Sequence, residues 1–333
     1  MARRPTLEAL LKFLTADMQS AFLAAIQGVV DQVILNEVVE AVIAGDADRA
    51  FELLGFNPGA LRPITAAIER MYERAGEWAA EGYPRLPGYP FFRFNVRDPR
   101  AENWMRDKSS ELISRITEDV RTNIRNTLTD GITRGVNPRN TALNIVGRVD
   151  RKTGARVGGA IGLTPHQENW TRSFRMALEG NSPSYFDRAL RDKRFDGIVQ
   201  RAIDSGKPLD AATIEKLVVR YRSNALRLRG ETIARTESIA SQAAAELESA
   251  RQVLATGAVQ QKDIERVWDS AGDRRVRPDH RAMDGQTVGL DEPFKTPDGT
   301  LLMHPGDTSL GATAADVVAC RCVARTKINW LGV

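Results

Sequence analysis

The sequence has few cysteines, few histidines and few aromatic residues. Its 333 residues include two cysteines, Cys320 and Cys322, three histidines, and 6% aromatic residues. A disulfide between residues two positions apart is geometrically awkward, so the chain is not a disulfide scaffold and a reducing compartment is expected. No apolar run approaches the ~20 residues of a membrane span, and the N-terminus does not predict a signal peptide. We therefore expect no membrane partner.

Charge is spread unevenly along the chain, although the net charge is only +4. Residues 1–81 carry a net charge of −5, and residues 231–333 carry −3. Residues 82–230 contain 28 basic and 16 acidic groups, so this middle segment holds the whole basic excess. Much of that excess is arginine, whose planar guanidinium binds phosphates and carboxylates through two hydrogen bonds. The segment either contacts phosphates or an acidic protein surface, or it is an ordinary solvated helical surface.

Apolar residues that recur every three or four positions predict a chain made mostly of helices. The predicted helices span residues 6–44, 63–80, 98–134, 139–149, 164–180, 183–205 and 210–255. The first is unusually long, and we expect it either to break near Gly28 or to serve as an interaction arm. After Gly257 helical periodicity fades, and short strands are predicted at 265–269, 300–304 and 320–326. The predicted fold class is mainly α, with long helices followed by a small C-terminal α+β module.

Breaker residues and charge suggest a linear domain order. Residues 82–99 hold four prolines and two glycines, which is typical of a linker. Residues 151–163 are glycine-rich, but no Lys-Ser/Thr pair follows Gly158-Gly159 as in a phosphate-binding loop, so a flexible connector is expected. The predicted domains are an N-terminal helical region at 1–81, the linker at 82–99, a basic helical middle region at 100–230 and the C-terminal module at 231–333.

Four potential zinc ligands lie in the C-terminal module. They are His280, His304, Cys320 and Cys322. Imidazole and thiolate are preferred zinc ligands, so a structural zinc site is one interpretation, although the spacing is not that of a zinc finger. Two buried cysteines with two surface histidines are the plainer interpretation. A nucleophilic cysteine paired with a histidine is a third, but no cysteine is placed at a helix N-terminus, where its pKa would fall.

Carboxylates also cluster in this module. They are Asp269, Asp273, Asp279 and Asp284. Such a group could bind a metal for hydrolysis, but arginines are interleaved with it, which favours a turn held by charge-assisted hydrogen bonds. The Arg235–Glu237 pair could suggest catalysis, but we expect these polar groups to tie the last long helix to the module.

An ordered set of short motifs resembles one family over about 90 residues. The set comprises Ala234-Arg235-Thr236-Glu237, Trp268-Asp269, residues 273–280, Met283-Asp284-Gly285-Gln286, Glu292-Pro293-Phe294, His304-Pro305-Gly306-Asp307 and Ala319-Cys320-Arg321-Cys322. Together they resemble the Mu F-like domain of phage minor head, or head morphogenesis, proteins. Residues 135–139, 145–149 and 161–164 resemble the helical region that precedes this domain, so the resemblance covers about 130–325. We expect a structural motif made of Arg235, Thr236, Glu237, Asp273, Arg277, Asp284, Gly285 and Arg321.

The resemblance implies a virion protein in several copies per particle, in the head interior or at the portal vertex, and in the host cytoplasm during assembly. Its implied partners are portal and capsid or scaffold proteins, and the basic middle region would contact double-stranded DNA through phosphates. No enzymatic activity is implied, and the one cofactor left open is a structural zinc. The alternatives are a DNA-binding protein acting in packaging or delivery, and a metal-dependent hydrolase.

Overall fold

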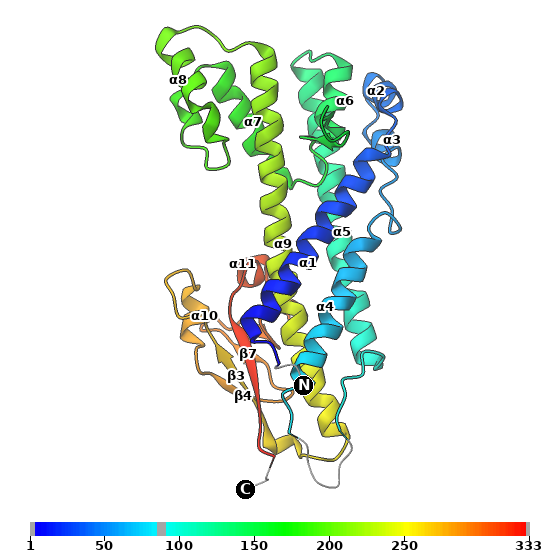
Figure 1. Cartoon of the computed structure of the whole chain (residues 1–333), viewed down its shortest axis with the longest axis vertical. Coiled ribbons are helices and arrows are strands. Elements are labelled where there is room, and N and C mark those ends of the chain that lie inside the picture. Colours follow the sequence, from blue (N-terminus) through cyan, green and yellow to red (C-terminus); the bar gives the residue numbers. More distant parts are fainter. Residues whose placement is uncertain (1–3, 85–90, 331–333) are drawn as a thin grey trace. The chain divides into compact units, whose positions relative to one another are not determined.

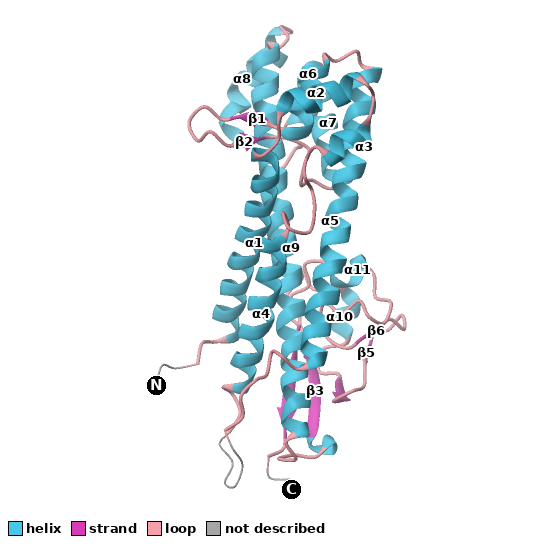
Figure 2. Cartoon of the chain, turned by 90° about the vertical axis from the view of Figure 1, so that its right-hand side faces the viewer, coloured by secondary structure: helices cyan, strands magenta, loops and turns pink. Residues whose placement is uncertain are grey.

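The structure is a computed structural model that describes residues 4–84 and 91–330 (Figure 1). Helices make up most of it (Figure 2). The described strands are short, and they lie in one small hairpin and in the segment that follows the last long helix. This confirms the predicted fold class, which is mainly α with a small C-terminal α+β module.

Contacts divide the chain into two compact units, each built from separate stretches of sequence. Unit 1 consists of residues 1–21, 64–110 and 231–333, and unit 2 of residues 22–63 and 111–230. Four helices contribute residues to both units: α1 (Leu7–Asp31), α4 (Arg62–Ala80), of which only the first two residues lie in unit 2, α5 (Pro99–Thr133) and α9 (Ala211–Ala255). The predicted domain ranges follow the linear sequence, and their boundaries stay predictions.

The second half of α9 forms the core of unit 1. From Ile239 to Ala250 this helix is buried on nearly every side, and most of its side chains there are alanine or serine. A helix that is buried all round belongs to a core, and small side chains let neighbouring elements approach it closely. Helix α4 (Arg62–Ala80) also belongs to this unit, and it buries Ile64, Ile68 and Met71 completely.

Unit 2 contains α2 (Leu35–Ile43), α3 (Ala47–Glu52), α6 (Pro138–Val146), α7 (Pro165–Glu179) and α8 (Asp196–Ser205). Capping residues define where two of these helices begin. Thr164 and Gln167 form a capping box at the start of α7, and the Asn137 side chain accepts the Arg139 amide at the start of α6. These signals are readable in the sequence, and both helices start within one residue of the predicted position.

The predicted helix at 6–44 is interrupted, but not at Gly28, which lies inside α1. The break falls at residues 32–34, between α1 and α2. Arg156, from a distant hairpin, donates its backbone N–H to Asp31 (3.0 Å) and its guanidinium to the Val33 carbonyl (3.4 Å). These contacts occupy polar groups at the end of α1, so the break has a tertiary cause.

Helix α1 also corrects an expectation about membrane spans. It is long and apolar enough to cross a membrane by length and composition, with a mean hydropathy of 1.3. A core helix passes the same test, and the apolar stripe of α1 is buried: Leu10, Leu14 and Met18 are at most 2% exposed.

Two other segments differ from their predictions. Residues 183–205, predicted as one helix, form 3₁₀ turns at Pro183–Tyr185 and Lys193–Phe195 followed by α8. The Ser182 and Asp192 side chains cap these turns, and such local bonds compete with a continuous helix. The glycine-rich connector contains strand β2 (Arg156–Val157), paired with β1 (Arg148–Val149). Of the predicted linker, residues 85–90 lie outside the described residues.

The C-terminal module is built on a three-stranded antiparallel sheet in the order β4-β3-β7. Its strands are β3 (Ile264–Asp269), β4 (Thr287–Gly289) and β7 (Val323–Ile328), and Trp268 of β3 lies opposite Ala324 of β7. A second pair joins β5 (Phe294–Lys295) to β6 (Leu301–Leu302). Two short helices, α10 (Pro278–Ala282) and α11 (Ala314–Val317), complete the module beside the sheet (Figure 1). The predicted strand at 320–326 begins only at Val323, because the two cysteines form a loop before it.

Candidate metal centre and basic groove

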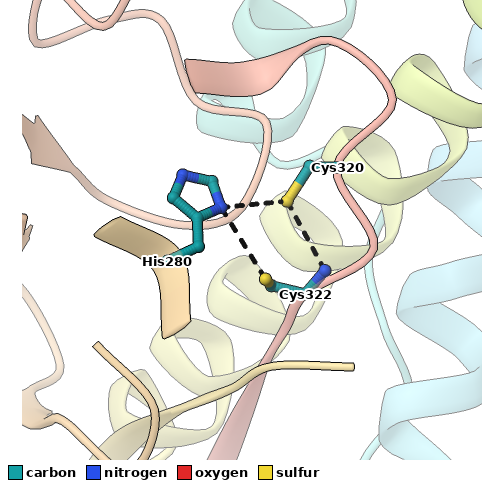
Figure 3. Close-up of side chains that lie close together, drawn as sticks. All are labelled: His280, Cys320 and Cys322. Atoms are coloured by element: carbon teal, nitrogen blue, oxygen red, sulfur yellow. Dashed lines mark hydrogen bonds between the residues drawn. The ribbon is translucent and has the colours of Figure 1, made fainter. Parts of the chain in front are cut away.

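Three of the four predicted metal ligands meet in the core of the C-terminal module. The His280 Nδ1 atom lies 3.5 Å from the Cys320 sulfur and 3.7 Å from the Cys322 sulfur. Figure 3 shows the imidazole and both sulfurs pointing toward one another. All three side chains are at most 2% exposed, and the cysteines belong to the apolar cluster around Trp268. We call these three residues the His/Cys cluster.

His280 is placed by the short helix α10. Pro278 stands in the first turn of this helix, where its missing N–H costs no hydrogen bond. The imidazole packs edge-on against Trp268, with ring centroids 5.2 Å apart. The His280 Nε2 atom has no hydrogen-bond partner in the described part of the chain. With Nδ1 facing the sulfurs, the ring therefore presents its acceptor nitrogen to the cysteines when Nε2 carries the proton.

The cysteine loop is fixed from two sides by residues of the predicted structural motif. The Ala319 amide donates to Thr236 Oγ1 of α9 (2.9 Å), and Ala319 has a positive φ of 53°. The Arg321 guanidinium makes a two-pronged ion pair with the Asp273 carboxylate. Arg277 donates to the Val318 carbonyl at 2.5 Å. These last two contacts hold the loop that carries His280 against the loop that carries both cysteines.

The turn after α10 is fixed by Asp284 and Gly285. Asp284 accepts the Ser270 amide (2.7 Å), and the Gly285 amide donates to the Trp268 carbonyl (2.8 Å). Gly285 has a φ of 77°, which favours glycine. Both ends of the α10 segment are therefore anchored to β3 or to the cysteine loop.

Electrostatics around the cluster follow from these contacts. The Arg321 guanidinium holds the pKa of the Asp273 carboxyl well below its ordinary value. The hydrogen bond from Cys322 lowers the pKa of Cys320 to about 4, and the same bond together with burial raises the pKa of Cys322.

The remaining predicted ligand, His304, lies elsewhere in the module. It is not one of the residues that gather at the His/Cys cluster, and its Nδ1 atom lies 3.1 Å from the Pro305 carbonyl oxygen. Burial lowers the pKa of His304, so its imidazole is neutral. Among the described residues, no further His, Cys, Asp or Glu joins the His/Cys cluster.

The four clustered aspartates, Asp269, Asp273, Asp279 and Asp284, do not form a metal site among the described residues. Asp269 pairs with Arg325, while Asp273 and Asp284 make the contacts given above. Asp269, Asp273 and Asp284 thus hold turns and strands in place, and arginines are the partners of the first two.

Arg235 and Glu237 do not reach the His/Cys cluster either. Arg235 pairs with Glu231 on the exposed side of α9. Glu237 is 1% exposed and forms a buried ion pair with Lys108 of α5 (3.3 Å). Sequence reasoning missed Lys108, because the two residues lie far apart in the chain.

A second feature that the sequence did not locate is a groove in unit 2 with a volume of about 850 Å³. Eight arginines or lysines and three carboxylates line it, and they come from the β1–β2 hairpin, the turn before α8 and the first half of α9. We call it the basic groove. Arg148 and Arg194 are paired with Glu215 and Asp192.

Other basic side chains of the groove are available to a ligand. Arg151 and Lys193 are exposed and make no ion pair with any described residue. Lys216 lies over the Phe195 ring, 5.1 Å from its centroid. The groove therefore has the net positive charge and the exposed cations that suit a polyanion.

Comparison with known proteins finds similarity in the part of the chain that contains the C-terminal module. Residues 193–325 match the phage Mu protein F like protein family. The minor head protein GP7 of Bacillus phage SPP1 is 35% identical over 89 residues, which are 27% of this chain and 26% of that protein. The chain thus matches about a quarter of the length of this curated relative. No solved structure matches the chain significantly.

The matched range contains the whole His/Cys cluster and every residue of the predicted structural motif. The resemblance predicted for residues 130–192 lies outside it and stays a prediction. Residues 193–325 are thus a Mu F-like region, and this region relates the chain to the phage minor head proteins.

Proposed function

We propose that the protein acts in head morphogenesis of a tailed phage, as a minor head protein in the head interior or at the portal vertex. The observation that carries the proposal is the match of residues 193–325 to the Mu F-like family. The proposed partners are portal and capsid or scaffold proteins, with several copies per particle. The proposed sites of action are the host cytoplasm during assembly and the virion afterwards.

A role without catalysis agrees with the chemistry of the module. The three residues of the His/Cys cluster are at most 2% exposed, so a substrate cannot reach their sulfurs or imidazole without opening the core. Asp273 and Asp284 are engaged in holding loops rather than left free to activate water. A metal-dependent hydrolase is therefore the less favoured alternative.

Contact with DNA is the second part of the proposal, and the basic groove supports it. Double-stranded DNA presents a regular series of phosphates, and each phosphate neutralised by a protein cation releases counterions. Arg151 and Lys193 are exposed and free to make such contacts, whereas several other arginines of unit 2 are already paired. The expected binding is independent of sequence and weakens with salt.

A charge-reversal pair tests this part. We expect the double variant Arg151→Glu and Lys193→Glu to bind double-stranded DNA more weakly than the wild type in gel retardation at low salt. Each lost phosphate contact should also lower the slope of log affinity against log salt by about 0.9. The matched control reverses Arg62 and Arg139, which are exposed in unit 2 but do not line the groove.

The outcome separates the groove from general charge. If both double variants bound DNA equally weakly, the groove would not be the DNA-binding site, and the net charge of the protein would account for the binding. Absence of DNA retardation by the wild type at low salt would contradict DNA contact altogether, and the groove would then serve an acidic protein surface.

A further inference from the structure

The geometry points to a structural metal site in the C-terminal module, and we propose that His280 Nδ1 and the thiolates of Cys320 and Cys322 bind one zinc ion. The inference rests on the three side chains alone and not on the proposed function. It uses three of the four residues that the sequence suggested and leaves out His304.

Distance is the first argument. With Zn–S bonds of ~2.3 Å and a Zn–N bond of ~2.0 Å, neighbouring ligand atoms of a tetrahedral site lie about 3.5–3.8 Å apart. The two distances from His280 Nδ1 to the cysteine sulfurs are 3.5 and 3.7 Å, and all three ligand atoms lie within 4.8 Å of one another. The three atoms are therefore close enough together to bind one cation.

Valence is the second argument. A neutral imidazole nitrogen has a single lone pair and accepts one proton, yet two sulfurs face His280 Nδ1. A thiophilic cation satisfies the imidazole and both sulfurs at once. Two thiolates balance the charge of one divalent ion, so the occupied site is electrically neutral, which suits its burial.

Preorganisation is the third argument. The Asp273–Arg321 ion pair and the hydrogen bond from Arg277 to the Val318 carbonyl join the two loops that carry the ligands. The Thr236 hydroxyl fixes the cysteine loop to α9. Contacts of this kind, which orient ligands from outside the coordination sphere, are typical of metal sites. They also give four residues of the predicted structural motif, Thr236, Asp273, Arg277 and Arg321, a common purpose.

Metal content of the full chain tests the proposal. Protein prepared in reducing buffer, without chelators or an affinity tag that binds metal, should contain about one equivalent of zinc by elemental analysis. Cobalt added in place of zinc should give the charge-transfer absorption of thiolate-bound Co²⁺. Less than about half an equivalent of zinc, together with no such absorption on cobalt addition, would overturn the proposal.

Ligand variants sharpen the assignment. His280→Gln, Cys320→Ser and Cys322→Ser should each lose the bound zinc, while the matched controls His166→Gln and His304→Gln keep it. His166 is exposed in unit 2, and His304 is buried in the same module but away from the cluster. Full zinc content in the three ligand variants would contradict the site, and loss of zinc in a folded His304→Gln protein would contradict the ligand set.

A measurement on the unaltered chain covers the case in which a ligand variant does not fold. A zinc chelator should lower the melting temperature of the wild type, and added Zn²⁺ should restore it while Mg²⁺ should not. An unchanged melting temperature after complete removal of zinc would show that the metal does not stabilise the module.

Discussion

Asp273 shows how a carboxylate that could act as a reactive group is instead held in an ion pair. Asp273 stands in a run of charged residues that could be read as a hydrolytic site, but its carboxylate is held by Arg321 and by the Arg275 amide (2.8 Å). Its partners keep it ionised, and the low pKa of Asp273 records that interaction. The same carboxylate joins the two loops of the His/Cys cluster, so the role of Asp273 is to position these loops relative to each other.

The ionisation of Asp273 predicts a pH dependence. Its pKa is lowered on folding, so its contribution to stability is present above the unfolded value of ~3.9 and is lost as the pH falls through the folded value. Asp273→Asn should therefore unfold at lower urea concentration than the wild type at pH 7. The difference between the two proteins should shrink below about pH 4.

Urea titrations at pH 7, 5 and 3, in the presence of saturating zinc, provide the measurement. Asp279→Asn is the matched control, because Asp279 is exposed and lies close to Asp273 in the chain, in the first turn of α10. A difference that stays constant down to pH 3 would mean that an ionised Asp273 does not support the module.

Secondary-structure elements differ in how well the sequence predicts them. Helices α4, α5 and α9 lie within one residue of their predicted starts and ends, because their apolar stripes and flanking glycines or prolines are local signals. The interruption of α1 at residues 32–34 could not be predicted, because Arg156 supplies the bonds that make it. The proposed metal site could not be fully predicted either. The sequence contains four candidate ligands, and only the folded structure shows which three of them lie together.

Buried ion pairs between elements escape sequence analysis for the same reason. Arg222 of α9 and Glu168 of α7 form an ion pair at most 5% exposed. Much of the basic excess of the middle region is consumed in such pairs, including Arg229 with Asp119. A charge count cannot separate paired arginines from exposed ones, and this is why the sequence did not locate the basic groove.

The Arg222–Glu168 pair predicts a large effect on stability. Glu168→Gln leaves the Arg222 guanidinium buried without its counter-charge, which should lower the free energy of unfolding by about 3–5 kcal/mol. Glu52→Gln removes one partner of the exposed pair with Arg49 and should change the free energy by at most ~1 kcal/mol. Urea denaturation of the two variants compares them, and similar small effects in both would show that the buried pair does not stabilise unit 2.

At the scale of the whole molecule, the buried His/Cys cluster and the basic groove lie in different units. Unit 1 contains the Mu F-like module with its buried His/Cys cluster, and unit 2 contains the basic groove. The family match spans residues of both units, because it begins at residue 193 and ends at 325. The proposed zinc site therefore falls in unit 1 and the proposed DNA contact in unit 2.

The most direct test of the account is the amount of this protein in purified particles of the phage that encodes it. Quantitative mass spectrometry should compare DNA-filled particles with particles lacking DNA, relative to the major capsid protein. The account predicts the same few copies in both, because head proteins rather than DNA alone retain the protein. Absence from both kinds of particle, or presence only in particles that contain DNA, would contradict its assignment as a minor head protein held by the head.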